Sequence, residues 1–263
     1  MELTAFASFL DTAFGWYDSA ILTALHAIRC GLLTAFFKFL TIIGEKGIVF
    51  FLIAVVLMLF PKTRKTGICL FGAVGCGALI TNIILKDWVA RPRPFNFEPY
   101  VQFWKDVGSP AEDGFSFPSG HVTSAAAGMM ALRLMKGKKW TVPAIVWVVL
   151  MALARNYLVA HYPSDVLFGA LIGVVSAVIA YYITQLIYNI LHSFRRTGWA
   201  QIILSWSAPD FAGIPSRLGL VDEERNECTE AEEPAARSTR SVRSERGERA
   251  ARPSSGYKGR HEK

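Results

Sequence analysis

The feature that most constrains the fold of this chain is a series of long apolar runs that carry almost no charge. One of them reads FFLIAVVLMLF, at residues 50–60. Hydrophobic residues make up 52% of the 263 residues, and the mean hydropathy is +0.32 even though residues 222–263 are strongly polar. A large soluble helical domain is the alternative, but such a domain mixes apolar and charged residues more evenly. The pattern therefore predicts an integral membrane protein.

Six apolar segments predict an all-α integral membrane bundle of about six transmembrane helices. Several are shorter than the ~20 residues that span a bilayer core, so snorkelling Lys and Arg side chains or local thinning have to make up the difference. Lys38 makes the first segment the weakest candidate. Residues 1–30 are apolar in patches, which favours an amphipathic interfacial segment or an extension of the first span. The segments cover residues 31–43, 47–60, 67–85, 119–135, 142–157 and 163–191, within a membrane domain at residues 31–192.

Basic clusters between these segments predict the orientation. Under the positive-inside rule, the joins that carry such clusters face the cytoplasm. With six crossings the clusters fall on one face, so both termini are expected in the cytoplasm and the other joins at the outer face of the cell membrane. The net charge of +7 is explained by these clusters and by the tail, so we expect no nucleic-acid partner. The clusters are Lys62, Arg64 and Lys65; Lys136, Lys138 and Lys139; and Arg195 and Arg196.

The remaining parts of the chain carry weaker signals. Residues 193–221 include GWAQIILSW and are expected to lie at the interface. Residues 222–263 form an acidic block and then an Arg-rich block, which predicts a disordered charged tail that is either solvated or in contact with anionic lipid heads. The N-terminal MELTAFASFL lacks a basic region, so no cleavable signal peptide is expected. The cysteines have no metal-ligand spacing and are expected to be unpaired; they are Cys30, Cys69, Cys76 and Cys228.

Three polar clusters stand out against this apolar background. They are KDWVARPRP at residues 86–94, PSGH at 118–121 and ARNYLVAHYPSD at 154–165. The predicted topology brings all three to the outer face. Ionisable groups at a membrane surface are costly and usually functional. The cations Lys86, Arg93 and Arg155 would then surround His121 and His161, and such a set suits an anionic ligand such as phosphate.

The ends of two predicted helices add to this site. Pro118 and Pro163 suit first helical turns, whose free N–H groups bind phosphate. Ser119 and the amide of Gly120 are expected to donate to the same ligand, since glycine permits close approach. Asp165 lies four residues after His161, a spacing that lets the carboxylate fix the imidazole tautomer. A single histidine at a helix end is usually only a cap, so the specific signal is the joint occurrence of the three clusters.

The clusters resemble the three-part signature of the type 2 phosphatidic acid phosphatase superfamily, K-x6-R-P, P-S-G-H and S-R-x5-H-x3-D. The one departure is Ala154, where the signature has Ser; Arg91–Pro92 is a second R-P at the wrong distance from the lysine. The resemblance implies a metal-independent lipid phosphatase without cofactors. It implies that His161 is the nucleophile that forms a phosphohistidine, that Asp165 orients it, and that His121 protonates the leaving group and then activates water. The implied phosphate-binding residues are Lys86, Arg93, Ser119, Gly120 and Arg155.

Other functions remain open at this stage. A metal-dependent hydrolase with two His and one Asp as ligands is disfavoured, because three nearby cations would repel the metal ion. A non-catalytic lipid-phosphate binding or transport protein and a vanadate-binding oxidative enzyme are further alternatives. The expected partners are a lipid phosphate substrate and the bilayer. A polyprenyl diphosphate is the first candidate, and phosphatidate, phosphatidylglycerol phosphate and a sphingoid phosphate remain open. Specificity is expected from residues 95–117, where the aromatic candidates for substrate contact or for interface anchoring are Phe97, Tyr100, Phe103 and Trp104.

Overall fold

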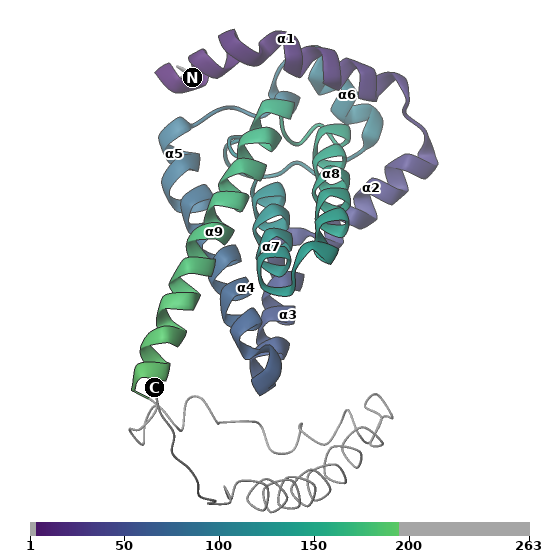
Figure 1. Ribbon diagram of the computed structural model, residues 1–263. Helices are drawn as coiled ribbons and strands as arrows, with labels where there is room; N and C mark the ends of the chain where they lie inside the picture. The colour runs from purple at the N-terminus through teal and green to yellow at the C-terminus, as the bar shows by residue number, and fades with distance from the viewer. Residues whose placement is uncertain (1–3, 195–263) are drawn as a thin grey trace, which may run out of the picture. The chain divides into compact units, whose positions relative to one another are not determined.

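The computed structural model describes residues 4–194, and within them every regular element is a helix (Figure 1). Of the interfacial segment predicted at 193–221 the structure describes only the first two residues, and the charged tail predicted at 222–263 lies outside the described residues. The helices are α1 (Ala5–Ala27), α2 (Gly31–Ile43), α3 (Ile48–Leu59), α4 (Pro61–Leu79), α5 (Lys86–Val89), α6 (Tyr100–Val107), α7 (Gly120–Lys136), α8 (Thr141–Tyr157) and α9 (Pro163–Ser193). Short 3-10 turns lie at Glu45–Gly47, Pro94–Asn96 and Lys138–Trp140, and a π-helical turn, Ile80–Leu85, joins α4 to α5.

Local sequence explains where several helices begin and end. Pro61 and Pro163 occupy the first turns of α4 and α9, where the missing N–H of proline costs no hydrogen bond. Thr4 caps α1 by accepting a hydrogen bond from the amide of Ala7 at 3.2 Å. Gly137 follows α7 with a φ of +91°, a conformation that favours glycine, and the chain then turns into α8. Each of the six predicted apolar segments is helical, close to its predicted bounds.

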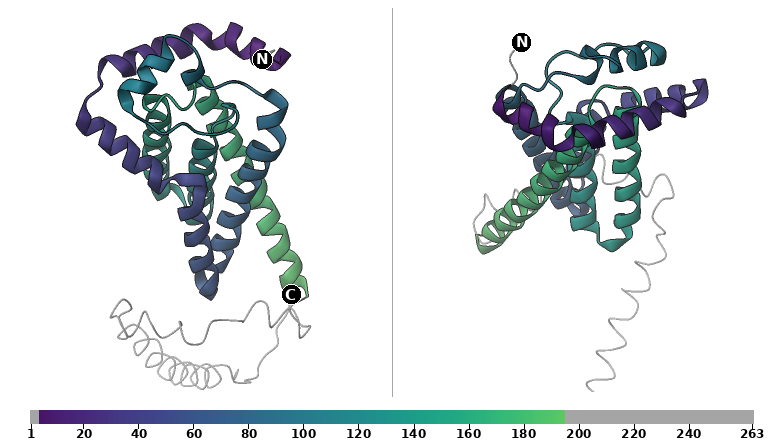
Figure 2. Two further views of the ribbon diagram at one scale, coloured as in Figure 1. Left: turned by 180° about the vertical axis from the view of Figure 1, so that it is seen from behind. Right: turned by 90° about the horizontal axis from the view of Figure 1, so that it is seen from above.

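Helix α7 lies at the centre of the bundle and packs against α4, α8 and α9 (Figures 1 and 2). Small residues allow this packing. A Cβ atom at Gly169 of α9 would lie 2.8 Å from the carbonyl oxygen of Ser119, and one at Gly173 would collide with the carbonyl oxygen of Thr123. Only glycine lets the two backbones approach so closely. This contact sets the start of α7 beside the start of α9, where two of the three polar clusters lie.

The number of separate spans differs from the prediction. By length and composition, three described stretches can cross a membrane, and they are Pro61–Asn96, Lys138–Tyr157 and Pro163–Ser193. Helices α2 and α3 have 13 and 12 residues, about 20 and 18 Å at 1.5 Å per residue, each shorter than a ~30 Å hydrocarbon core. Their axes differ by 43°, so α3 continues the path of α2 instead of reversing it, and the pair makes at most one further span.

Because α2 and α3 together form one bent path, the two ends of the described chain lie at opposite ends of the bundle and not on one face as predicted. Helix α1 lies across the end of the bundle that holds the polar clusters, where Asp18 accepts a hydrogen bond from the amide of Ser164 at 2.8 Å (Figure 1). Helix α9 runs from that end to the opposite one, where the described chain stops. The expectation of both ends on one face is therefore not supported for the described chain. The α3–α4 and α7–α8 turns, with their basic residues, do lie away from the polar clusters (Figure 1).

Candidate active site

A cavity of about 620 Å³ gathers residues from all three polar clusters. Ser119 and Asp165, the two predicted residues that do not line it, are fully buried beside it. A second cavity of about 600 Å³, between α1 and α2, contains none of the predicted residues. The structure therefore brings together segments that are far apart in the chain, as the sequence predicted. The predicted residues that line the larger cavity are Lys86, Arg93, Gly120, His121, Arg155 and His161.

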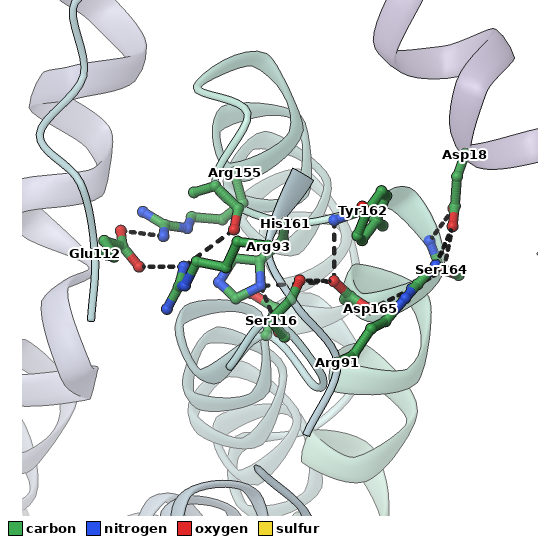
Figure 3. A network of polar contacts seen from close by, with 12 residues as sticks. Asp18, Arg91, Arg93, Glu112, Ser116, Arg155, His161, Tyr162, Ser164 and Asp165 are labelled. Atoms are coloured by element: carbon green, nitrogen blue, oxygen red, sulfur yellow. Dashed lines mark hydrogen bonds and ion pairs between the residues drawn. The ribbon is translucent and has the colours of Figure 1, made fainter. Parts of the chain in front are cut away.

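His161 lies in the turn between α8 and α9 and is almost completely buried. Its Nδ1 lies 2.7 Å from the backbone carbonyl oxygen of Ser116, an acceptor, so Nδ1 carries the proton and donates it (Figure 3). The other ring nitrogen, Nε2, is then unprotonated in the neutral ring. Burial lowers the pKa of His161 well below its ordinary value, and the nearby Arg155 and Arg93 lower it further. The imidazole is thus neutral at pH 7 and has a lone pair for nucleophilic attack.

Asp165 does not contact His161 directly, as the sequence had predicted it would, but through Ser116. Its Oδ2 is 3.9 Å from Nδ1 of His161, too far for a hydrogen bond. Instead, Oδ2 accepts hydrogen bonds from the hydroxyl of Ser116 and from the amide of Tyr162, the latter at 3.0 Å. Asp165 therefore fixes Ser116, and the carbonyl oxygen of Ser116 accepts the hydrogen bond from the imidazole of His161. Ser116, which the sequence analysis did not select, is the direct partner of His161.

Arg91, set aside in the sequence analysis, is the centre of a buried ion network (Figure 3). Its Nη1 donates to Asp165 at 2.6 Å and to Ser164 at 2.8 Å, and its Nη2 donates to Asp18 at 2.9 Å. Its Nε and Nη2 also donate to Asp11, at 3.0 and 2.7 Å. The network attaches α1 to the start of α9 and fixes Asp165. The sequence signal for these contacts was the presence of two acidic residues, Asp11 and Asp18, in an otherwise apolar N-terminal segment.

Arg93 and Arg155 converge on one carboxylate, that of Glu112 (Figure 3). Nη1 of Arg93 donates to Oε2 of Glu112 at 2.9 Å, and Nη2 of Arg155 donates to Oε1. Burial alone would raise the pKa of Glu112, but the two guanidinium groups outweigh it and lower the pKa to about 2. Glu112 is therefore ionised at neutral pH. Glu112 was not among the predicted site residues, because a glutamate in a polar loop has no distinctive sequence pattern.

Further polar groups at the site have no protein partner among residues 4–194. The hydroxyl of Ser119 and Nε of Arg155 are buried without a hydrogen-bond acceptor or donor. Both groups are thus available to hydrogen-bond a bound anion. The amide of Ser119 is already used, since it donates to the carbonyl oxygen of Asp165 at 3.2 Å. Lys86 begins α5 directly after the π-helical turn, an element that frequently marks functional sites.

The backbone of the turn before His161 is strained. Val159 has a φ of +57°, which is unfavourable for a β-branched residue. Strain of this kind costs about 1–3 kcal/mol and persists where the surrounding structure fixes it. Here the carbonyl oxygen of Ala160 accepts a hydrogen bond from Arg93 at 3.0 Å. Arg93, a candidate for phosphate binding, therefore also stabilises the turn that carries His161.

The predicted aromatic residues do not line the larger cavity. Phe103 stacks on His26 with ring centroids 4.0 Å apart, and Tyr100 packs edge-on against Tyr162. The part of residues 95–117 that does line the cavity is the segment Ser-Pro-Ala-Glu-Asp at 109–113, which has no aromatic residue. Among the described residues, Cys30, Cys69 and Cys76 are unpaired, and no group of three His, Cys, Asp or Glu side chains is arranged to hold a metal ion.

Comparisons with known proteins agree with this geometry. The sequence model of the PAP2 superfamily matches residues 65–188, which contain all three polar clusters. An undecaprenyl-diphosphatase of Sulfolobus acidocaldarius is 31% identical over 121 residues, 46% of this chain and 56% of the relative. Phosphatidylglycerophosphatase B of Bacillus subtilis is 32% identical over 168 residues, 59% of this chain and 77% of the relative. The chain thus matches between about half and three quarters of the length of these curated relatives.

The fold has a solved counterpart. The crystal structure of a transmembrane PAP2-type phosphatidylglycerolphosphate phosphatase from Bacillus subtilis superimposes with a TM-score of 0.54 at 27% identity. The superposition covers 70% of this chain and 90% of that structure. The likeness therefore extends over the helical bundle that carries the cavity.

Proposed function

This chain belongs to the PAP2 superfamily, and from that membership we propose that it is a membrane phosphatase that removes a phosphoryl group from a lipid phosphate through a phosphohistidine intermediate. The observation that carries the proposal is the state of His161. Its Nδ1 is held by a carbonyl oxygen, which leaves Nε2 as the nucleophile. The ring lines the same cavity as Lys86, Arg93 and Arg155, three cations suited to phosphate.

The proposed reaction has two steps. In the first, Nε2 of His161 attacks phosphorus, the bond from phosphorus to the lipid oxygen breaks, and the protonated form of His121 gives its proton to that oxygen. Burial and the nearby Arg155 lower the pKa of His121 to about 3, so this step requires the negative charge of the bound phosphate beside the ring to raise that pKa and hold the proton. In the second, His121 takes a proton from water, whose oxygen attacks phosphorus, and the bond from phosphorus to His161 breaks to release inorganic phosphate. The three cations and the hydroxyl of Ser119 stabilise the charge on the phosphoryl oxygens; donors of this kind are commonly worth about 3 kcal/mol each.

The departure at Ala154 does not weaken the proposal. Ala154 is fully buried and packs in an apolar cluster with Met151 and Tyr157, outside the cavity lining. A serine there would not belong to the residues that surround the phosphoryl group. The alternative of a non-catalytic binding protein, which rested on this position, therefore gains no support from the structure.

The substrate is proposed to carry its phosphate at the membrane surface and its apolar chain in the bilayer. The two curated relatives act, by their names, on undecaprenyl diphosphate and on phosphatidylglycerophosphate. A polyprenyl diphosphate is our first candidate for this chain, ahead of phosphatidate. The site is proposed to face the outside of the cell membrane, because the basic turns between α3 and α4 and between α7 and α8 lie at the other end of the bundle.

A panel of lipid phosphates assayed with the purified chain tests this function. We expect release of inorganic phosphate from at least one of undecaprenyl diphosphate, phosphatidylglycerophosphate and phosphatidate, and we expect the rate to survive a strong chelator. Absence of phosphate release from all three lipids would refute the proposal, and loss of the rate on chelation would favour the metal-dependent alternative.

A further inference from the structure

Residues on one face of α2 line both cavities. They recur every three or four positions, which is the spacing of a single helical face. Lys38 belongs to both sets, so it lies where the second cavity adjoins the cavity that holds His161. The residues are Gly31, Thr34, Ala35 and Lys38 at the cavity of about 600 Å³, and Lys38, Thr41, Ile42 and Glu45 at the cavity of about 620 Å³.

Lys38 is a cation without an acidic partner in the described part of the chain. Its Nζ donates a hydrogen bond to the carbonyl oxygen of Gly108 at 2.8 Å, and it makes no ion pair there. Arg93 and Arg155, by contrast, share the carboxylate of Glu112. A charged residue in an apolar helix of a membrane protein is costly and usually has a function. A phosphate oxygen can replace the neutral carbonyl oxygen as the acceptor, because hydrogen bonds between ionised groups are stronger.

The acidic side chains of the cavity do not neutralise Lys38. Glu112 is engaged by the two arginines, and Asp113 is exposed and makes no ion pair within the described part of the chain. Glu45 lies on the same face of α2 but seven residues further on, about 10 Å along the axis at 1.5 Å per residue. Water and salt screen charges at such a separation, since the Debye length is about 10 Å at 0.1 M ionic strength.

The larger cavity has room for more than one phosphoryl group. Its volume of about 620 Å³ lies within the range of about 300–1,000 Å³ that is usual for sites of drug-sized ligands. The cations proposed to hold the scissile phosphoryl group come from the polar clusters at 86–94 and 154–165, whereas Lys38 comes from α2. The four-carbon stem of lysine is flexible and carries a point charge that can follow a neighbouring anion. Lys38 can therefore contact a group next to the scissile phosphoryl group.

We propose that Lys38 is a substrate-binding residue that contacts the second phosphoryl group of a lipid diphosphate, so that the cavity prefers a diphosphate to a monophosphate with the same chain. A monophosphate has no group at this place, and the contact therefore favours the diphosphate alone. The inference rests on the proposed function and names its substrate class. Lys38 lies outside residues 65–188, which match the family model.

In the reaction of a diphosphate, Nε2 of His161 attacks the terminal phosphorus. The bond from that phosphorus to the bridging oxygen breaks, and the bridging oxygen keeps the electron pair and leaves as part of the lipid monophosphate. Lys38 stabilises the charge on this leaving phosphate. Its effect should therefore appear in kcat/KM, which includes both the binding of the diphosphate and the first chemical step.

The experiment compares farnesyl diphosphate with farnesyl monophosphate, which share their chain. The purified full chain in detergent micelles is assayed for the initial release of inorganic phosphate, and the ratio of kcat/KM for the diphosphate to that for the monophosphate measures specificity. Lys38→Met removes the charge and keeps a long side chain. We expect it to lower this ratio at least about tenfold, equivalent to about 1.4 kcal/mol. Lys38→Arg should keep the ratio within about threefold of the wild-type value, because the charge is retained.

Lys105 offers a matched control. It is an exposed lysine of α6 that lines neither cavity, so Lys105→Met should leave the ratio unchanged. The ratio also separates binding from a structural role. Lys38→Met loses the hydrogen bond to Gly108 at the start of the loop that carries Glu112. A disturbed loop would lower kcat/KM for both substrates by the same factor and would not change the ratio.

Several outcomes would overturn the inference. If the ratio falls less than about threefold in Lys38→Met, whether or not both rates fall, Lys38 does not recognise the second phosphoryl group. If neither Lys38→Met nor Lys38→Arg can be recovered folded, Lys38 is needed for stability and the inference fails. A wild-type chain that hydrolyses the monophosphate but not the diphosphate would also overturn it, while the proposed function stands. A wild-type chain that releases phosphate from no lipid phosphate would count against the proposed function instead, so the two failures are distinguishable.

Discussion

Replacing Arg91 with glutamine tests the buried ion network that joins α1 to the site. The side chains of Arg91, Asp18 and Asp165 are 1%, 2% and 0% exposed. Without the guanidinium group, two buried carboxylates lose their cation. Asp11 is 44% exposed, so water screens its charge and it contributes little. The loss of folding free energy should therefore come from the uncompensated charges of Asp18 and Asp165.

The size of this effect follows from the burial of the pair. Removing one partner of a buried ion pair costs about 3–5 kcal/mol, because the remaining charge is left uncompensated. A chain of this size loses about 2–4 °C of melting temperature per kcal/mol. We therefore expect Arg91→Gln to melt roughly 6–20 °C below the wild type. The turnover rate should fall as well, since Arg91 fixes Asp165 and Asp165 fixes Ser116, the partner of His161.

Thermal unfolding of the detergent-solubilised protein, followed by circular dichroism, measures the effect. Arg133→Gln, at the far end of α7, is the control for the loss of an arginine. Asp18→Asn should cost less in the Arg91→Gln background than in the wild type, because the carboxylate that it removes is already unpaired there. A melting temperature of Arg91→Gln within about 2 °C of the wild type, or strictly additive costs, would refute the reasoning.

Three further predictions concern the chemistry. His121→Ala should lower kcat/KM, which reports the first step, by about 10²- to 10⁴-fold for an alkyl phosphate but much less for p-nitrophenyl phosphate, because a good leaving group needs no proton; equal losses in kcat/KM would contradict the acid role. Because burial lowers the pKa of His161, the proposed nucleophile stays unprotonated below pH 6.5, and kcat/KM corrected for substrate ionisation should lose no activity through protonation of His161 until well under that pH; a His161 ring that titrates near pH 6.5 by NMR would show the shift to be wrong. Ala154→Ser should change kcat less than about threefold and not raise the melting temperature, because it puts a hydroxyl into an apolar cluster; a large gain in kcat would show that position 154 does belong to the site.

Much of the site was predictable because its residues occur in short segments of distinctive chemistry. Lys86, His121 and His161 lie at helix ends in an otherwise apolar chain, and ionisable residues there require a functional explanation. Their convergence followed from the order of apolar segments alone. The six helices were also predictable, since each is a long apolar run bounded by Pro, Gly or Lys.

The partners of these residues were harder to predict. Glu112, Asp18 and Ser116 are polar residues in a loop or an amphipathic helix, where most such residues are only solvated. Asp18 meets Ser164 across 146 residues of sequence, and no local pattern specifies a contact of that separation. Arg91 was not chosen because its distance from Lys86 did not fit the family signature, although a buried arginine at the end of an apolar segment requires a counter-ion.

The number of spans was not predictable from apolar runs for a geometric reason. The Gly44–Gly47 connection between α2 and α3 permits either a reversal or a bend, and hydropathy does not distinguish them. The structure has a bend of 43°. The lengths of α2 and α3 were the available warning, since neither reaches across a bilayer core alone.

Trapping the covalent intermediate tests the role of His161 most directly. The purified chain is mixed with a substrate labelled with ³²P in the scissile phosphate, quenched in alkali during turnover, digested, and analysed for the labelled peptide. The account predicts an acid-labile, alkali-stable label on His161, present in wild type and absent in His161→Asn. Label on any other side chain, or normal turnover by a folded His161→Asn variant, would contradict it.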